Sequence, residues 1–148
     1  MREVWLTQKE PQSASLIEQI KNISWPAGAH LAELLENHKL TDWEQVLILS
    51  DQEKLVGFVA VLKEDLLENS PWTPFIGLVF VHEDYRGQHL SELLVKKAEE
   101  KLIQVGFHEA YIMTRETGRL YEKLGYQKIA ETKDKFGHLE EVLHKEKL

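Results

Sequence analysis

The 148-residue sequence contains no cysteine, which excludes disulfide bonds, thiolate metal sites and a cysteine nucleophile. It also lacks any run of about 20 apolar residues, the length that a membrane-spanning helix requires. The beginning of the chain holds no apolar stretch long enough for a signal peptide. We therefore expect a cytoplasmic protein without a membrane partner. The seven histidines show no metal-ligand spacing, so we expect no metal centre.

Negative charge is in excess and unevenly distributed. The formal net charge is −7; residues 1–75 hold 6 Lys and Arg against 12 Asp and Glu, and residues 76–148 hold 12 against 13. An acidic chain is a poor candidate for nonspecific binding to nucleic acid. The nearly neutral second half can still host an anionic ligand. The length and the 43% hydrophobic content predict one globular domain, residues 1–148.

Apolar periodicity predicts alternating strands and helices, with no repeat and no long linker. The predicted order is a strand at Glu3–Thr7, a helix from a cap at Ser13 to a stop at Trp25–Gly28, a second helix ending near Asn37–Lys39, a hairpin of Gln45–Leu49 and Leu55–Leu62, a strand at Phe75–Val81, a helix at Gln88–Val105, a strand at Ala110–Thr114, a helix at Thr117–Leu124, and a strand pair, Tyr126–Thr132 and Leu139–His144, turning at Phe136-Gly137. Phe75–Val81 is apolar on both faces, as a central strand covered on both sides should be. The fold class is therefore α/β.

One polar turn joins this central strand to the long helix. The segment reads Val79-Phe80-Val81-His82-Glu83-Asp84-Tyr85-Arg86-Gly87-Gln88-His89-Leu90-Ser91. The beginning of a helix offers amide N–H groups without intrahelical partners and the positive end of its dipole, which together suit a phosphate. Gly87 lets a ligand approach the backbone closely. Taken alone, this glycine is equally compatible with a simple strand-to-helix turn.

The segment resembles the acetyl-CoA-binding signature of the Gcn5-related N-acetyltransferase (GNAT) superfamily, in which a strand runs into Arg/Gln-x-x-Gly-x-Gly/Ala and a helix. A second signature, a helix ending in Leu-Tyr-Glu-Lys-Leu-Gly-Phe, is matched by Leu120-Tyr121-Glu122-Lys123-Leu124-Gly125-Tyr126. The two motifs lie in the superfamily's order and at about its usual separation. The resemblance implies a mixed, mostly antiparallel central sheet of about six to seven strands flanked by about four helices. His89 and Ser91 are departures, since they occupy positions where the superfamily usually has small residues.

The resemblance also implies the cofactor contacts. The pantetheine arm of acetyl-CoA would lie along Val79, Phe80 and Val81, with Thr114 as a further contact. The pyrophosphate would meet the amides of Gly87, Gln88, His89, Leu90 and Ser91. Arg86 would support the phosphates by charge, a salt bridge to Glu83 or Asp84 being the alternative.

Tyr121 matches the superfamily tyrosine that serves the departing thiolate. A phenol has a pKa of about 10 and a thiol about 8.5, so full proton transfer is uphill by roughly 2 kcal/mol. We therefore expect Tyr121 to donate a hydrogen bond and to complete the proton transfer late.

The sequence does not assign the general base to a single residue. Many members of the superfamily place a glutamate where Met113 stands here; Glu109, Glu116, His82 and a bound water are the other candidates. The acceptor region implied by the resemblance contains Trp25, His30, Glu68, Trp72 and Thr73. Two tryptophans near an acidic segment either hold a cationic amine or serve as packing residues.

The sequence thus predicts an acetyl-CoA-dependent N-acetyltransferase. The acceptor is a primary amine on a small molecule, peptide or protein. The amine attacks the thioester directly, and a backbone N–H near Phe80 or Val81 stabilises the oxyanion. The alternative is an acyl-CoA-binding sensor or interaction domain that does not turn over. Edge strands leave room for a homodimer.

Overall fold

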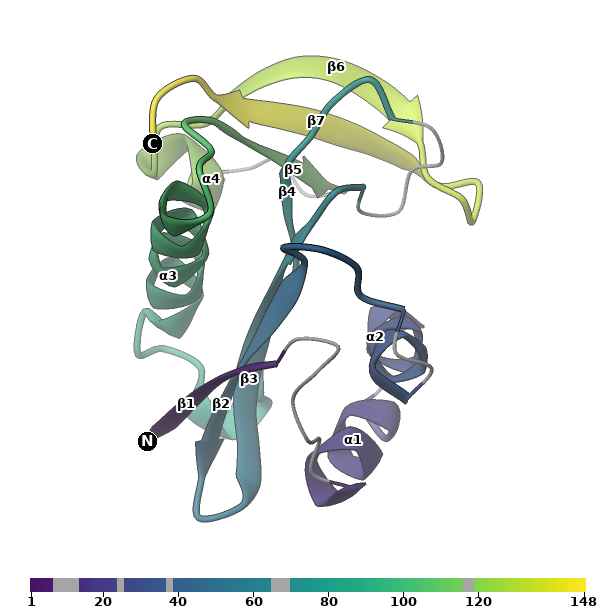
Figure 1. The fold of residues 1–148 in the computed structure, drawn as a ribbon, viewed down its shortest axis with the longest axis vertical. Helices are drawn as coiled ribbons and strands as arrows, with labels where there is room; N and C mark the ends of the chain where they lie inside the picture. Colours follow the sequence, from purple (N-terminus) through teal and green to yellow (C-terminus); the bar gives the residue numbers. More distant parts are fainter. Residues whose placement is uncertain (7–13, 24–25, 37–38, 65–69, 116–118) are drawn as a thin grey trace. The chain divides into compact units, whose positions relative to one another are not determined.

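The computed structural model describes residues 1–6, 14–23, 26–36, 39–64, 70–115 and 119–148. The elements follow the predicted order (Figure 1): β1 Arg2–Leu6, α1 Ala14–Lys21, α2 Pro26–Glu36, β2 Gln45–Asp51, β3 Lys54–Leu62, β4 Phe75–Val81, a 3₁₀ turn η1 Glu83–Tyr85, α3 Leu90–Gln104, β5 Ala110–Thr114, α4 Arg119–Lys123, β6 Gln127–Lys133 and β7 Leu139–Lys145. The strands pair in the order β1-β2-β3-β4-β5-β7-β6. The β4–β5 pair is parallel, whereas β1–β2, β5–β7 and β6–β7 are antiparallel. This confirms the predicted fold class.

The chain forms two compact units, which are described separately. The first unit comprises residues 1–60 and 78–94, and the second comprises residues 61–77 and 95–148. Strands β3 and β4 and helix α3 each contribute residues to both units. Among the described residues, no helix is long and apolar enough to cross a membrane.

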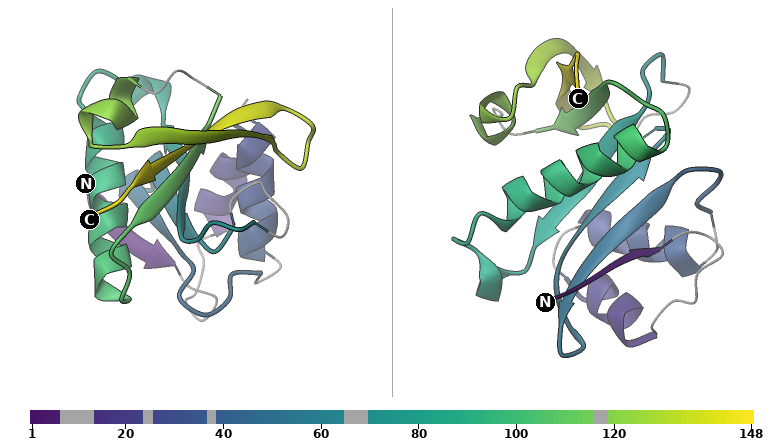
Figure 2. Two further views of the ribbon diagram at one scale, coloured as in Figure 1. Left: turned by 90° about the horizontal axis from the view of Figure 1, so that it is seen from above. Right: turned by 60° about the vertical axis from the view of Figure 1, so that its left-hand side comes forward.

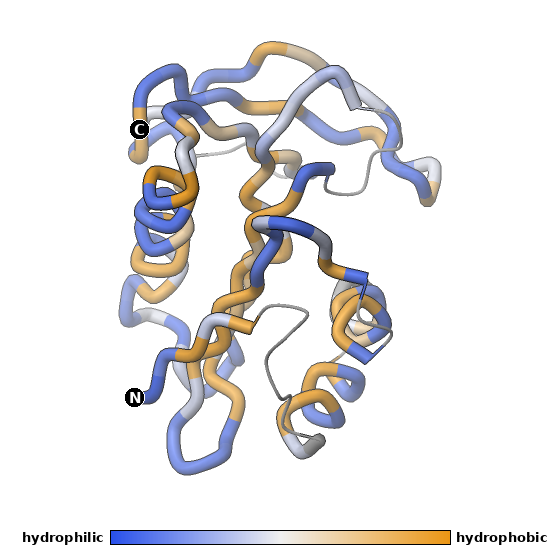
Figure 3. The backbone as a smooth tube through the Cα atoms, viewed as in Figure 1, coloured by the Kyte–Doolittle hydropathy of each residue, from blue (hydrophilic) through white to orange (hydrophobic). Residues whose placement is uncertain are grey.

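In the first unit, α1 and α2 pack together and β2 and β3 form a hairpin (Figures 1 and 2). Gln52 and Glu53 join the two strands with φ of 48° and 72°, the left-handed conformation that a two-residue hairpin turn requires. The tip of the hairpin is hydrophilic and the strands behind it are hydrophobic (Figure 3). The predicted hairpin is therefore confirmed.

The predicted stop of the first helix is wrong in one respect. Pro26 and Gly28 lie in the first turn of α2, and Trp25 falls outside the described residues. Proline is favoured at the first helical position, where its missing N–H has no intrahelical partner. Gly28 is buried, and an added Cβ would come within 2.5 Å of Ile23 Cγ1 and 2.9 Å of the Ile20 carbonyl oxygen. The glycine therefore serves the packing of α2 against α1.

Strands β3 and β4 approach closely at Gly57. A Cβ on Gly57 would lie 2.5 Å from the carbonyl oxygen of Phe80. The His82 N–H donates to the Val56 carbonyl at 2.7 Å, and the rings of Phe58 and Phe80 stack with centroids 5.0 Å apart. The end of β4 is thus fixed to β3 by backbone contact, and only glycine fits at position 57.

In the second unit, β5 pairs with β7 and β7 with β6 (Figure 2). Lys145 reaches Glu99 of α3, and Lys145 is in register with Ala110, so α3 packs on the sheet face that carries Ala110. Helix α3 ends at Gly106, whose φ is 105°. There Gly106 N–H donates to Ile103 O and Phe107 N–H to Leu102 O, the Schellman arrangement that satisfies the last carbonyls.

Element bounds shift slightly from those predicted. The helix predicted at Gln88–Val105 runs from Leu90 to Gln104, because Gln88 and His89 belong to the preceding turn. The helix predicted at Thr117–Leu124 is described from Arg119 to Lys123, and its first predicted residues lie outside the described part of the chain.

Replacing Gly57 tests the close approach of β3 and β4. We expect Gly57→Ala to destabilise the protein by about 1–3 kcal/mol, because the methyl group overlaps a backbone oxygen that cannot rotate away. Thermal unfolding should shift down by roughly 2–4 °C for each kcal/mol. Gly57→Val should cost more than Gly57→Ala. Valine has a higher β-strand propensity than alanine, so propensity alone predicts that the valine variant is the more stable of the two. A valine variant more stable than the wild type would show that the contact does not limit side-chain size at position 57.

Candidate functional site

Strand β4 is irregular at its centre. Leu78 is buried yet has a φ of 55°, in the left-handed region where a bulky side chain costs on the order of 1–3 kcal/mol. The strand is buried from Phe75 to Leu78, whereas Val79, Phe80 and Val81 are only partly buried. The three residues predicted to meet pantetheine are therefore the three that the strand leaves partly accessible.

A single turn of 3₁₀ helix, η1, follows β4. His82 caps it: its Nδ1 accepts from the Asp84 N–H at 3.2 Å, and its carbonyl accepts from the Tyr85 N–H at 2.9 Å. The backbone of the turn is thus capped by the side chain of His82, and the carboxylate of Asp84 lies 3.7 Å from the same ring nitrogen.

The next residues form a cradle, which we define as Arg86–Ser91. Gly87 and His89 have φ of 85° and 57°, and an added Cβ on Gly87 would meet nothing within 4 Å. Residues 86–89 are exposed. The first intrahelical bond of α3 runs from Leu93 N–H to His89 O at 3.2 Å, so the amides at the beginning of the helix have no carbonyl partner within it. His89 thus combines an exposed side chain with the left-handed backbone conformation that glycine favours.

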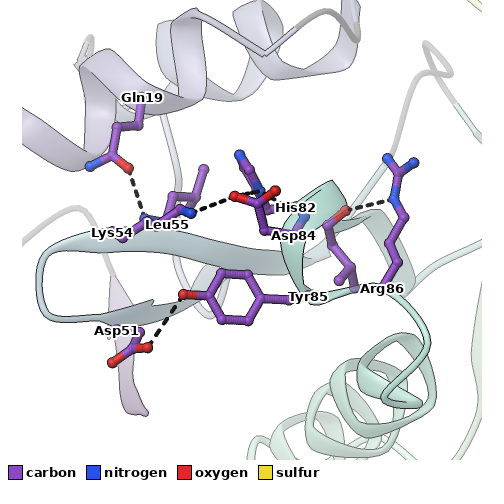
Figure 4. Close-up of polar contacts among 9 residues, drawn as sticks. Gln19, Asp51, Lys54, Leu55, His82, Asp84, Tyr85 and Arg86 are labelled. Atoms are coloured by element: carbon purple, nitrogen blue, oxygen red, sulfur yellow. Dashed lines mark hydrogen bonds and ion pairs between the residues drawn. The ribbon is translucent and has the colours of Figure 1, made fainter.

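The β2–β3 hairpin braces this turn (Figure 4). Lys54 Nζ lies 2.5 Å from Asp84 Oδ2 and 5.4 Å from the centre of the Tyr85 ring. The Tyr85 hydroxyl donates to Asp51 Oδ2 at 3.3 Å. The hydrogen bond from Lys54, together with its charge, lowers the pKa of Asp84, and the same bond raises the pKa of Lys54. These contacts join the turn to both strands of the hairpin.

The hairpin is held in turn by α1. The side-chain oxygen of Gln19 accepts from the Leu55 N–H at 2.8 Å, and its amide nitrogen donates to the Glu53 carbonyl at 2.8 Å (Figure 4). The brace therefore extends from the turn through β3 to a helix of the same unit.

Arg86 pairs with neither Glu83 nor Asp84 in the described structure. Its Nε donates to the Val81 carbonyl at 3.3 Å, and the guanidinium points away from Asp84 (Figure 4). Asp84 is instead paired with Lys54. The salt bridge considered as an alternative role for Arg86 is not formed, which leaves this exposed cation beside the cradle.

In the second unit, Tyr121 lies in α4. The helix ends at Gly125, with φ of 97°. Gly125 N–H donates to Glu122 O and Tyr126 N–H to Tyr121 O, each at 3.0 Å, in a second Schellman arrangement. The ring of Tyr121 is partly buried and meets that of Tyr126 edge-on, with centroids 6.3 Å apart. Thr114, the last residue of β5, is in the same unit and half-buried.

Tyr126 anchors the end of α4. Its residue exposure is only 1%, and its hydroxyl donates to Glu99 Oε2 at 2.7 Å. Lys145 Nζ lies 3.1 Å from the same carboxylate and 5.7 Å from the centre of the Tyr126 ring. Burial and the negative charge of Glu99 raise the pKa of Tyr126. The superfamily signature has phenylalanine at this position, so the anchoring hydroxyl is a departure of this chain.

The side-chain candidates for a general base are engaged by other groups or lie outside the described residues. Met113 is buried and packs with Phe75, Trp72 and Tyr111. Glu109 accepts from the Tyr111 hydroxyl at 2.9 Å and lies 2.9 Å from His144 Nε2. His82 uses Nδ1 to cap η1, and Glu116 is outside the described part.

Sequence reasoning missed His144 as a polar partner. Tyr111 and His144 are opposite each other in the β5–β7 register, and their rings stack 4.5 Å apart. Burial and the hydrogen bond to Glu109 raise the pKa of Tyr111. The only sequence signal for this group is the strand register, which the periodicity of two separate strands does not define.

The residues predicted to form the acceptor region do not all lie in one described part of the chain. Trp25 and Glu68 lie outside the described residues, His30 belongs to α2 in the first unit, and Trp72 and Thr73 precede β4 in the second. The ring of Trp72 lies 6.5 Å from that of Tyr111. In the described ranges, no three His, Cys, Asp or Glu side chains gather as a metal site.

Comparisons with known proteins agree with this fold. Residues 14–126 match the acetyltransferase (GNAT) family. A solved aminoglycoside 6′-acetyltransferase type Ii is similar with a TM-score of 0.72 and 21% identity, covering 99% of this chain and 97% of that one. An aminoglycoside 6′-N-acetyltransferase complexed with coenzyme A has a TM-score of 0.70 and 17% identity, covering 98% and 96%.

A GNAT family acetyltransferase from Elizabethkingia anophelis with acetyl-CoA bound has a TM-score of 0.68 and 15% identity, covering 98% of this chain and 97% of that one. At these identities the solved structures show the fold. No curated protein matches the chain in sequence.

Removing the Tyr126 hydroxyl tests the anchor of α4. We expect Tyr126→Phe to lower the free energy of unfolding by about 1–3 kcal/mol, because the carboxylate of Glu99, whose side chain is only 13% exposed, loses a hydrogen bond. Tyr111→Phe is the matched control, since its partner Glu109 is 46% exposed and can turn to water. Denaturant unfolding of the two variants measures the difference, and equal costs would contradict the anchor.

The same hydroxyl should make stability sensitive to alkaline pH. Because the folded-state pKa of Tyr126 is raised, the unfolded chain releases this proton near pH 10 while the folded protein keeps it. Stability from this group is complete below pH 10 and falls above it, by about 1.4 kcal/mol at pH 11. The wild type should therefore lose more stability between pH 8 and 11 than Tyr126→Phe. Parallel curves would argue against a raised pKa.

Proposed function

Because the chain belongs to the GNAT acetyltransferase family, we propose that it transfers an acetyl group from acetyl-CoA to a primary amine. The observation that carries the proposal is the cradle Arg86–Ser91, whose residues 86–89 are exposed and whose backbone is left-handed at Gly87 and His89 directly before α3. A backbone of this shape at a helix N-terminus suits a pyrophosphate. Two similar structures are described with coenzyme A or acetyl-CoA bound, which supports the choice of donor.

The residues divide the binding of the donor between them. The partly buried backbone of Val79–Val81 takes the pantetheine arm as an added strand. The amides of Gly87–Ser91 hold the pyrophosphate, and the guanidinium of Arg86, which forms no ion pair with Glu83 or Asp84, adds positive charge beside it. Thr114 is the proposed contact from β5.

The reaction is a direct acyl transfer. The lone pair of a neutral amine attacks the thioester carbonyl, and an N–H of Phe80 or Val81 donates to the oxygen that becomes negative. The C–S bond then breaks, and the thiolate departs with a hydrogen bond from Tyr121. The attacking nitrogen, which becomes positively charged on attack, loses one proton to solvent or to a base, so the products are a neutral amide and the CoA thiolate.

The candidate bases bear on the kind of acceptor. With Met113 buried at the expected glutamate position, no carboxylate is assigned as a base there. An amine with a pKa near 10.4 is neutral in roughly one molecule in a few thousand at pH 7, whereas one with a pKa near 8 is neutral in roughly one in ten. We therefore propose small-molecule amines of low pKa as the easier acceptors. Two similar structures are aminoglycoside acetyltransferases, so aminoglycosides belong in the first panel.

Thiol release tests the proposal directly. Acetyl-CoA is incubated with a panel of amines that includes aminoglycosides, α-amino compounds and lysine-type amines, and free CoA is measured. The proposal expects amine-dependent release together with an acetylated product in the mass spectrum. CoA at 100 times its dissociation constant should also add about 2.7 kcal/mol of stability. Stabilisation without turnover would favour the sensor alternative. The absence of both stabilisation and turnover would refute the proposal.

Tyr121→Phe tests the role of the phenol. We expect kcat to fall about 10- to 100-fold while the dissociation constant of CoA changes less than twofold, because the hydroxyl acts only on the departing sulfur. Tyr111→Phe removes a phenol outside the motif and should change kcat less than twofold. An unchanged rate in Tyr121→Phe would remove this residue from the mechanism.

A further inference from the structure

The cradle contains an electrostatic conflict that the hairpin resolves. CoA is a polyanion, yet the turn that leads into the cradle carries two exposed acidic residues, Glu83 and Asp84. Like charges beside a phosphate site raise the free energy of the complex. Lys54 places its ammonium group 2.5 Å from Asp84 Oδ2 and so cancels one of these charges (Figure 4).

Stability of the fold does not explain this pair. Lys54 and Asp84 are 46% and 55% exposed, and exposed ion pairs contribute little to folding. The turn itself is held by other contacts: His82 caps it, His82 N–H bonds to Val56 O, and Tyr85 bonds to Asp51. Replacing Asp84 by asparagine therefore removes the charge beside the cradle, keeps a side-chain oxygen that can accept from Lys54, and leaves these other contacts of the turn in place.

We propose that Lys54, at the start of β3, sets the affinity of the cradle for the phosphates of CoA by neutralising Asp84. The inference rests on the proposed function, since it concerns the same phosphate site. It makes the β2–β3 hairpin part of the CoA site and assigns Asp84 as a charge that weakens CoA binding. Lys54 and Asp84 are thus affinity-setting residues that act through the charge of the turn.

Opposite effects of the two single variants test the proposal. With CoA as the probe at low salt, Asp84→Asn should lower the dissociation constant about three- to tenfold, and Lys54→Gln should raise it by a similar factor. The double variant should return to within about twofold of the wild type. The effects of both single variants should shrink at 0.5 M NaCl, because salt screens exposed charges.

A matched pair elsewhere in the first unit controls for net charge. Lys39 and Glu33 lie 2.7 Å apart and are 53% and 54% exposed. Glu33→Gln and Lys39→Gln make the same changes in charge, and we expect less than twofold effects on the dissociation constant of CoA. Equal effects from this pair would overturn the proposal, because they would show a dependence on net charge and not on position.

Three other results would contradict either the role of Lys54 and Asp84 or the proposed function. Weaker CoA binding by Asp84→Asn, with an unchanged thermal midpoint, would overturn the proposal and show that the pair acts by holding the turn. Unchanged affinity in every variant would overturn it as well. A wild-type protein that binds no CoA at either salt concentration would refute the proposed function itself, which the variants alone cannot do.

Discussion

The contact between Gly57 and the carbonyl of Phe80 is the constraint on which the rest of the first unit depends. It lets β4 lie against β3 closely enough for His82 N–H to reach Val56 O. That bond fixes where the strand ends, and the 3₁₀ turn, the cradle and the first residues of α3 follow from this point. The side chains of the hairpin then reach the turn because β3 is already adjacent. A hydrogen atom in place of a side chain at one position thus governs the placement of the phosphate-binding candidate.

Backbone strain near the cradle occurs at residues that are not glycine. Leu78 and His89 both have positive φ, which costs side chains free energy. Such conformations persist where the surroundings impose them: Leu78 is buried, and the His89 carbonyl accepts the first bond of α3. The directions of the neighbouring amides are therefore set by the fold before any ligand arrives. Preorganised donors of this kind need no rearrangement on binding, which would favour the phosphate binding and acyl transfer proposed above.

Local patterns in the sequence predict much of this fold and its candidate site, because they act over short distances. Alternating apolar residues define β2 and β3, and the two signature motifs identify the cradle and Tyr121. The contacts that were missed join distant segments: Lys54 to Asp84 across 30 residues, Tyr85 to Asp51 across 34, and His144 to Glu109 across 35. They depend on strand register and on the placement of the turn. Gly28 was misjudged for the same reason, since its role comes from packing against α1.

The anchor of α4 has a consequence for how this sequence can evolve. Glu99, Tyr126 and Lys145 come from α3, the end of α4 and β7, and the ion pair spans 46 residues of chain. Replacing the lysine alone leaves a mostly buried carboxylate without its ion-pair partner. Replacing the glutamate alone removes the partner of both an ammonium group and a phenol. Each single step should therefore lower stability, whereas a joint exchange of all three for well-packed apolar residues should cost little. In related sequences that descend from this chain, substitutions at these three positions should therefore occur together.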